Sequence, residues 1–90
     1  DIEELPYGTY QINGTLAIDD LVELLVFEPE EANDVETAGG LLLSLFDRIP
    51  KEGDVAVLED RGTKVTFTVL AMDRLRIDRI CMAIDRPDEK

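Results

Sequence analysis

The chain has 90 residues, which is enough for one domain with a modest core and too few for a second domain. Hydrophobic residues make up 44% of the chain and charged residues 33%, and this composition excludes a disordered tail. The net charge of −12 disfavours nucleic acid and anionic lipid as partners, and no apolar run approaches the roughly 20 residues of a membrane span, so we expect no membrane insertion by this fragment.

The first predicted elements are a strand and a helix. We interpret residues 1–6 as the end of a linker and residues 7–13 as a short strand that ends at an Asn-Gly turn signal. Thr15 is a candidate cap for the helix that follows, and Asp19 and Asp20 occupy its first turn, where the helix dipole favours negative charge. Its apolar residues recur at helical spacing, at Ile18, Leu21, Val22 and Leu25.

Residues 27–36 are predicted to form a polar, proline-containing loop with five carboxylates. These are Glu28, Glu30, Glu31, Asp34 and Glu36. Oxygen-rich loops bind Mg²⁺ or Ca²⁺ in many proteins, so these five residues are the candidate metal ligands. Their spacing is not that of an EF-hand loop, and a solvated connector without a metal is the alternative.

A second helix is predicted from a cap at Thr37 to residue 46 or 47. The pair Gly39-Gly40 near its start is unusual, because glycine costs about 1 kcal/mol per helix position relative to alanine. Close packing against a neighbouring element would explain the pair. The alternative is a ligand that approaches the backbone N–H groups, which makes Gly39 and Gly40 the candidate cofactor-binding residues.

The remainder of the chain predicts three consecutive strands, at residues 54–59, 63–72 and 76–85, after Pro50 and a turn end the second helix. The middle strand alternates, and its predicted core side holds Val65, Phe67, Val69 and Ala71. In the last strand, Ile77 departs from the alternation of the apolar residues after it. A β-bulge near residues 78–79 would return Ile77 to the core.

The predicted order of elements is therefore β-α-α-β-β-β. Three hairpin-linked strands form a meander whose apolar face needs a cover, and the two helices supply it. We predict an α+β fold of two layers, an antiparallel β-meander covered by two helices. The domain is expected over residues 7–85, with residues 86–90 as a polar tail.

The charge is distributed unevenly along the chain. Residues 1–47 carry twelve carboxylates and no Lys or Arg, whereas residues 48–90 hold nine acidic and nine basic residues. The acidic half favours basic partner surfaces or divalent cations. A decoy that imitates nucleic acid and blocks a basic partner is a further alternative, which fits the first half only.

The sequence contains no assembled set of catalytic residues. It has no His, and its single serine, Ser44, lies in an apolar predicted helix without a base to activate it. Cys81 has apolar neighbours, and we expect a buried, inert thiol. We therefore expect that the protein is not an enzyme.

Three stretches together resemble the CorC/HlyC-type transporter-associated domain. They are residues 8–25, residues 37–54, and residues 67–77 with the apolar alternation that follows, and the resemblance covers roughly residues 7–84. The segment from Thr-x-Gly-Gly to Arg-Ile-Pro-x-x-Gly-Asp, within residues 37–54, is the most specific part. Asp47 stands where relatives often have glycine, which alters only the end of the second helix.

The resemblance implies a non-catalytic regulatory domain at the C-terminus of a membrane ion transporter. Family members carry a membrane domain, then a cytosolic CBS pair that senses adenine nucleotides, then this domain. Some are linked to magnesium and cobalt efflux and others are labelled hemolysin-like. The implied partners are the CBS pair and the membrane domain of a longer parent chain, on the cytoplasmic side of the membrane.

The resemblance implies no firm cofactor. The family fold is similar to a subdomain of a FAD-binding oxidoreductase family, so FAD enters by fold analogy only. Mg²⁺ or Ca²⁺ at the acidic loop is the other ligand considered. A homodimer formed through an exposed strand edge remains open as well.

Overall fold

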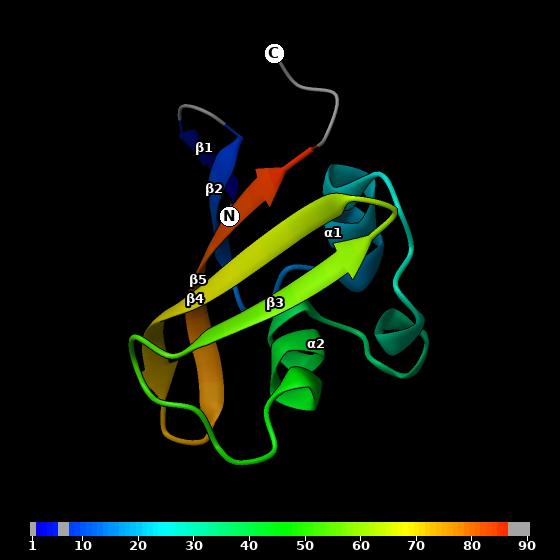
Figure 1. The fold of residues 1–90 in the computed structure, drawn as a ribbon. Coiled ribbons are helices and arrows are strands. Elements are labelled where there is room, and N and C mark those ends of the chain that lie inside the picture. The colour runs from blue at the N-terminus through cyan, green and yellow to red at the C-terminus, as the bar shows by residue number, and fades with distance from the viewer. Residues whose placement is uncertain (1, 6–7, 87–90) are drawn as a thin grey trace.

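A computed structural model describes residues 2–5 and 8–86 of the chain. One antiparallel sheet of five strands, in the order β1-β2-β5-β4-β3, forms one layer, and the helices lie on one of its faces (Figure 1). This arrangement confirms the predicted two-layer α+β fold. The elements in chain order are β1 (Ile2–Leu5), β2 (Thr9–Asn13), α1 (Ile18–Leu25), the short 3₁₀ helix η1 (Glu30–Asp34), α2 (Ala38–Leu45), β3 (Val55–Asp60), β4 (Thr63–Asp73) and β5 (Arg76–Asp85).

The sheet contains one strand more than predicted. Residues 2–5, interpreted as part of a linker, form β1 and pair with β2 from Ile2 opposite Ile12 to Leu5 opposite Thr9. The segment Ile-Glu-Glu-Leu does not alternate, so its own pattern does not predict a strand. The pairing satisfies the backbone groups that β2 would otherwise leave open at the sheet edge. Residues 1 and 6 of the predicted linker and residues 87–90 of the predicted tail lie outside the described residues.

The core lies between the sheet and the two helices. Leu21 and Leu25 of α1 and Leu41 and Leu42 of α2 are fully or almost fully buried against the sheet. The sheet contributes Ile12, Val65, Phe67, Val69, Ile80 and Met82, which are buried to the same degree. Outside the bulges described below, β3, β4 and β5 thus give every second side chain to the core, as the alternation in β4 and β5 predicted.

Two β-bulges between β4 and β5 change which residues face the core. The first bulge lies on β4, where one extra residue stands between Val69 and Ala71. The second bulge lies on β5, where Asp78 is the extra residue opposite the step from Ala71 to Met72. The second bulge returns Ile77 to the core, as predicted. The first corrects the prediction for Ala71, which lies opposite Arg79 on the other face, while Met72 packs against the core.

The helix boundaries agree with the predictions, but two local details differ. Thr15 does not cap α1: the cap position is Ala17, without a side-chain hydrogen bond, and the N–H of Ile18 donates to the carbonyl of Glu36 at 2.9 Å. A backbone partner from a distant segment therefore replaces the expected hydroxyl. The predicted loop at 27–36 also contains η1, which places Ala32 in the core.

Cys81 is not in the core either. It alternates with Ile80 and Met82, which both face the helices, so its thiol is half-buried on the opposite face of the sheet. The apolar neighbours that suggested burial lie on the other side of the strand. The expectation of a buried thiol was wrong for this reason.

Candidate functional site

The cleft at the start of α2 is the first candidate site. It has a volume of about 230 Å³ and lies between the N-terminus of α2, the turn after β2 and the β4–β5 hairpin. Both candidate cofactor residues, Gly39 and Gly40, line it, together with Thr15, Thr37 and the charged side chains of the hairpin, namely Asp73, Arg76 and Asp78. Arg76 lies 3.9 Å from Asp73, so the hairpin partly neutralises its own charge.

The backbone donors at the start of α2 are already engaged within the protein. The N–H of Ala38 donates to the carbonyl of Leu16 at 2.9 Å, and that of Gly39 donates to the carbonyl of Gly14 at 2.8 Å. Thr37 caps the helix as predicted, because its Oγ1 accepts from the N–H of Gly40 at 3.1 Å. A phosphate at this helix start would have to displace these bonds, and the geometry therefore does not favour Gly39 and Gly40 as cofactor residues.

Close packing explains Gly39, as the sequence suggested. A Cβ at this position would lie 3.0 Å from the carbonyl oxygen of Gly14 and 3.2 Å from that of Ile77. Gly14 is still more constrained, since its Cβ would lie 1.8 Å from the oxygen of Ile77. The sequence indicated only a turn at Gly14. Its contact with the β4–β5 hairpin involves residues more than sixty positions away and has no local signal.

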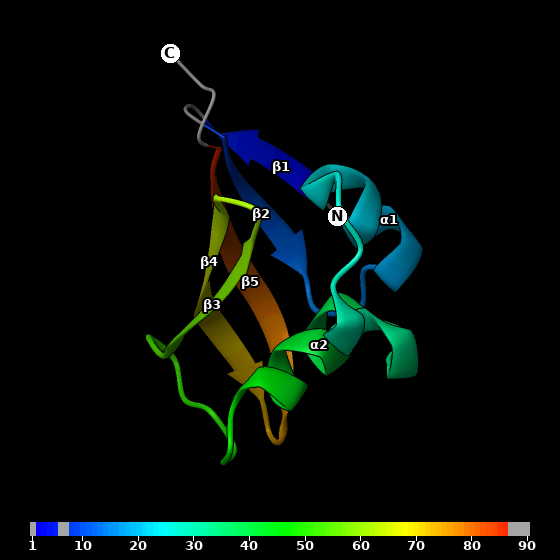
Figure 2. The same cartoon turned by 45° about the vertical axis from the view of Figure 1, so that its right-hand side comes forward.

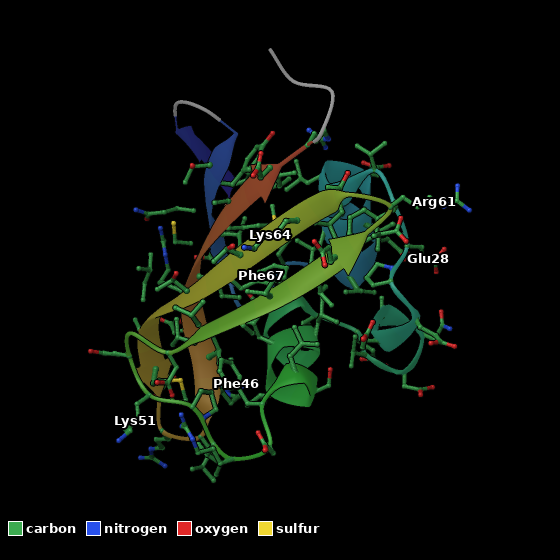
Figure 3. All side chains as sticks on the ribbon, viewed as in Figure 1. Glu28, Phe46, Lys51, Arg61, Lys64 and Phe67 are labelled. Carbon is green, nitrogen blue, oxygen red and sulfur yellow. The ribbon has the colours of Figure 1, made fainter. Side chains whose placement is uncertain are left out.

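The second candidate site is an acidic groove of about 410 Å³, lined by residues 27–31 and by Val57 to Asp60 at the end of β3. Folding brings Glu28, Glu30 and Glu31 beside Glu59 and Asp60, which the sequence had not linked to them. Figure 3 shows Glu28 beside the tip of the β3–β4 hairpin, where Arg61 lies.

The five predicted metal ligands are not all gathered in this groove. Asp34 and Glu36 do not line it. Within residues 2–5 and 8–86, no three carboxylate or thiol groups converge in an arrangement that could hold a metal ion. The metal role of these five residues stays a prediction.

The carboxylates on the acidic side of the molecule are not neutralised by neighbouring basic side chains of the described residues. The carboxylates of α1 and of the segment that includes η1 are all exposed, and among side chains described between Asp19 and Asp47 none forms an ion pair. These carboxylates are Asp19, Asp20, Glu23, Glu28, Glu30, Glu31, Asp34 and Glu36. They form an acidic surface that is available to a basic partner.

The turn between α2 and β3 contains the closest ion pair of the described residues. Arg48 Nη1 donates to Asp54 Oδ2 at 2.8 Å, and the backbone N–H of Lys51 donates to the same oxygen at 2.8 Å. The Arg48 hydrogen bond, and then the Lys51 N–H, lower the pKa of Asp54, and the same pair raises the pKa of Arg48. Gly53 and Asp54 also bond to Val69 of β4, so this segment has a structural role.

In the part of the chain that the structure describes, no helix is long and apolar enough to cross a membrane. The fold and its surface thus define a small two-layer α+β domain with one acidic side. Residues 3–86 match the model of the CorC/HlyC family, described as the transporter-associated domain, and the chain belongs to this family.

Relatives place the family in longer proteins. The chain is 32% identical over 60 residues to the UPF0053 protein YegH of Escherichia coli strain K12. That match includes 67% of this chain and 11% of YegH, so the chain corresponds to about a tenth of that relative.

Two solved structures share both sequence and fold with the chain. The transporter-associated domain of a CBS domain protein from Porphyromonas gingivalis is 29% identical, with a TM-score of 0.76 over 91% of this chain and 94% of that domain. The CorC/HlyC domain of a Xylella fastidiosa Temecula1 hemolysin, in complex with Mg²⁺ and Mn²⁺, is also 29% identical. Its TM-score is 0.67 over 97% of this chain and 98% of that domain.

Proposed function

We propose that this domain is a non-catalytic regulatory module at the C-terminus of a CBS-domain membrane ion transporter, which modulates transport from the cytosolic side. The observation that carries the proposal is the acidic surface of α1 and the η1 segment, whose exposed carboxylates form no ion pair with the described residues. Such a surface attracts a basic surface of the CBS pair or of the membrane domain.

The chemistry of the chain supports a role without catalysis. The only serine, Ser44, donates its hydroxyl to the carbonyl of Leu41 at 2.6 Å, and the chain has no His to activate it. The shifted pKa values of Asp54 and Arg48 arise from a turn that joins α2 to the sheet. The surface, rather than a reactive group, is therefore the part of the domain that we expect to act.

The test is ion flux through the parent protein with and without this domain. We expect deletion of the domain, or the combined change Glu28→Gln, Glu30→Gln and Glu31→Gln, to alter flux or its response to adenine nucleotides. Glu52→Gln is the matched control, because Glu52 is an exposed carboxylate in the charge-balanced second half. Unchanged flux after deletion would refute the proposal.

A second candidate function is divalent cation binding in the acidic groove. The specific observation behind it is the Xylella fastidiosa relative, whose structure is a complex with Mg²⁺ and Mn²⁺. Calorimetric titration of this chain with each ion is the test. Saturable binding at about millimolar or tighter should be lost in a Glu30→Gln, Glu31→Gln, Glu59→Gln variant and kept in an Asp19→Asn, Asp20→Asn variant. A flat titration would leave the protein-binding role alone.

A further inference from the structure

The face of the sheet opposite the helices is open. Figure 2 shows α1 and α2 on one side of the sheet, with none of the other described elements over the far side. Two apolar side chains on this face, Val55 and Val57 of β3, are 51% and 48% exposed. Isolated exposed valines are ordinary, but these two belong to a continuous uncharged surface.

The centre of the open face consists of two rows of side chains that lie opposite one another across the strands. One row is Val57, Thr66 and Ala83, and the other is Val55, Thr68 and Cys81. A third of the chain is charged, yet over β3, β4 and β5 neither row contains a charged residue. Beyond β5, the second row continues through Gln11 of β2 to Glu3 of β1. The central strand β5 contributes only Cys81 and Ala83, whose small side chains allow another surface to approach closely.

The two ends of this face carry opposite charge. At one end, Lys64 lies between Glu59 and Asp85 in the ladder, which leaves one excess negative charge. At the other end, half-buried Arg79 donates to Gln11 Oε1 at 2.6 Å and to Asn13 Oδ1 at 3.1 Å. Both acceptors are neutral amides, and among the side chains that the structure describes Arg79 forms no ion pair with a carboxylate.

We propose that a second copy of this chain binds to the open face, sheet against sheet, with its strands reversed. The two-fold axis lies between the two sheets and runs perpendicular to the strands, so that β5 packs over β5 of the partner copy in the opposite direction. This arrangement places Arg79 above Asp85 and Cys81 above Ala83 of the partner copy. The alternative axis, along the strands, would place Arg79 near Arg79 and Asp85 near Asp85, and the charges oppose it. Charge complementarity thus selects both the partner and its orientation.

The dimer is weak in the isolated domain because the uncharged centre is small for a stable interface. In a longer parent that already brings two copies together, the effective concentration is about millimolar and compensates for the small area. The inference is independent of the proposed function, since it concerns the open face and not the acidic surface.

The native thiol supplies the first test, because Cys81 is the single cysteine and lies near the middle of the open face. Packed sheets are about 10 Å apart, so a short bismaleimide should link two Cys81 side chains. We expect this linked dimer to form at least about tenfold faster than in a Cys81→Ala, Glu52→Cys control, whose thiol lies on an exposed turn. Equal rates in the two proteins would overturn the proposal.

Charge exchange supplies the second test, with sedimentation velocity as the measurement. Arg79 and Asp85 are six residues apart on β5, about 20 Å, so they cannot form an ion pair within one copy. Asp85→Arg or Arg79→Glu alone should weaken the dimer about tenfold or more, and the double variant should restore it. Thermal melting controls for folding, because Arg79→Glu also removes the bonds to Gln11 and Asn13, whereas Asp85 is exposed.

Two results of the second test would overturn the proposal. One is a chain that stays monomeric at millimolar concentration, which would leave the open face to another domain of the parent. The other is a dimer that neither single charge change weakens, because such a dimer must form through a different surface.

Discussion

Gly39 and Gly40 are neighbours in α2, and replacing each with alanine should affect stability in different directions. Alanine raises helix propensity by up to about 1 kcal/mol at either position. At Gly40 the new Cβ meets the Thr37 hydroxyl at 3.3 Å and the Val35 Cβ at 3.5 Å, which are side-chain atoms that can adjust. Gly40→Ala should therefore leave the free energy of unfolding unchanged or increase it.

At Gly39 the new Cβ meets backbone instead. The carbonyl oxygens of Gly14 and Ile77 lie at 3.0 and 3.2 Å, and neither can move without separating α2 from the sheet. The same movement would stretch the 2.8 Å bond from the Gly39 N–H to Gly14. Overpacking of this kind costs about 1–3 kcal/mol, which exceeds the propensity gain. Gly39→Ala should be less stable than Gly40→Ala by about 1–3 kcal/mol.

Thermal and urea unfolding of the two variants measure this difference. For a domain of this size 1 kcal/mol corresponds to about 4–8 °C in Tm, so the midpoints should differ by at least about 4 °C. Gly14→Ala serves as the extreme case, because its Cβ would lie 1.8 Å from the Ile77 oxygen. Equal midpoints for Gly39→Ala and Gly40→Ala would refute the reasoning, since they would show that the helix does not contact the sheet at Gly39.

Three further variants test separate parts of the fold. Thr37→Ala removes the acceptor for the Gly40 N–H and should cost about 1 kcal/mol in urea unfolding; no loss would mean that water replaces the cap. Phe67→Ala leaves a cavity in the centre of the core and should cost about 3–5 kcal/mol, visible as lost dispersion of methyl NMR signals. The pKa of Asp54 is lowered in the folded state, so the ionised carboxylate stabilises the fold near neutral pH, and this stabilisation is lost as the pH falls through the lowered pKa. Asp54→Asn should therefore flatten the fall of Tm below about pH 4. A parallel Tm profile for wild type and Asp54→Asn would contradict this.

Local patterns were sufficient for the helices and the main strands. The spacing of apolar residues in α1 and the hydroxyl of Thr37 before α2 are contained in single segments, and both features were predicted correctly. The alternation of β4 likewise gave the correct core face as far as Val69. In each case the pattern that predicts the element lies within the segment itself.

The errors concern features that depend on distant partners. β1 exists because β2 offers a free edge, and Ala71 changes face because a bulge shifts the register of β4 against β5. Cys81 was misjudged because its flanking residues were read as its environment, although neighbours in a strand point to opposite faces. The alternation of β5 alone would have corrected Cys81, whereas no single segment contains the information that places β1 and Ala71.

The same limit applies to the candidate sites. The glutamates at 28, 30 and 31 stand out in the sequence, but Glu59 and Asp60 join them only when the end of β3 folds against that loop. Gly14 drew attention only as part of a turn, whereas the fold uses it for the contact between β2, α2 and the β4–β5 hairpin. Both candidate sites form where segments distant in the sequence meet, and the sequence predicts their parts rather than their assembly.

Glu59 connects the two surfaces that we propose as interaction sites. It lines the acidic groove and also stands in the charged row at the end of the open face, opposite Lys64. Neutralising it should therefore affect both a basic partner in the groove and a second copy on the sheet. Glu28 belongs only to the groove and Arg79 only to the open face. Because changes at these two residues separate the surfaces, an effect shared by Glu28→Gln and Arg79→Glu would indicate that partner binding and self-association are coupled through the end of β3.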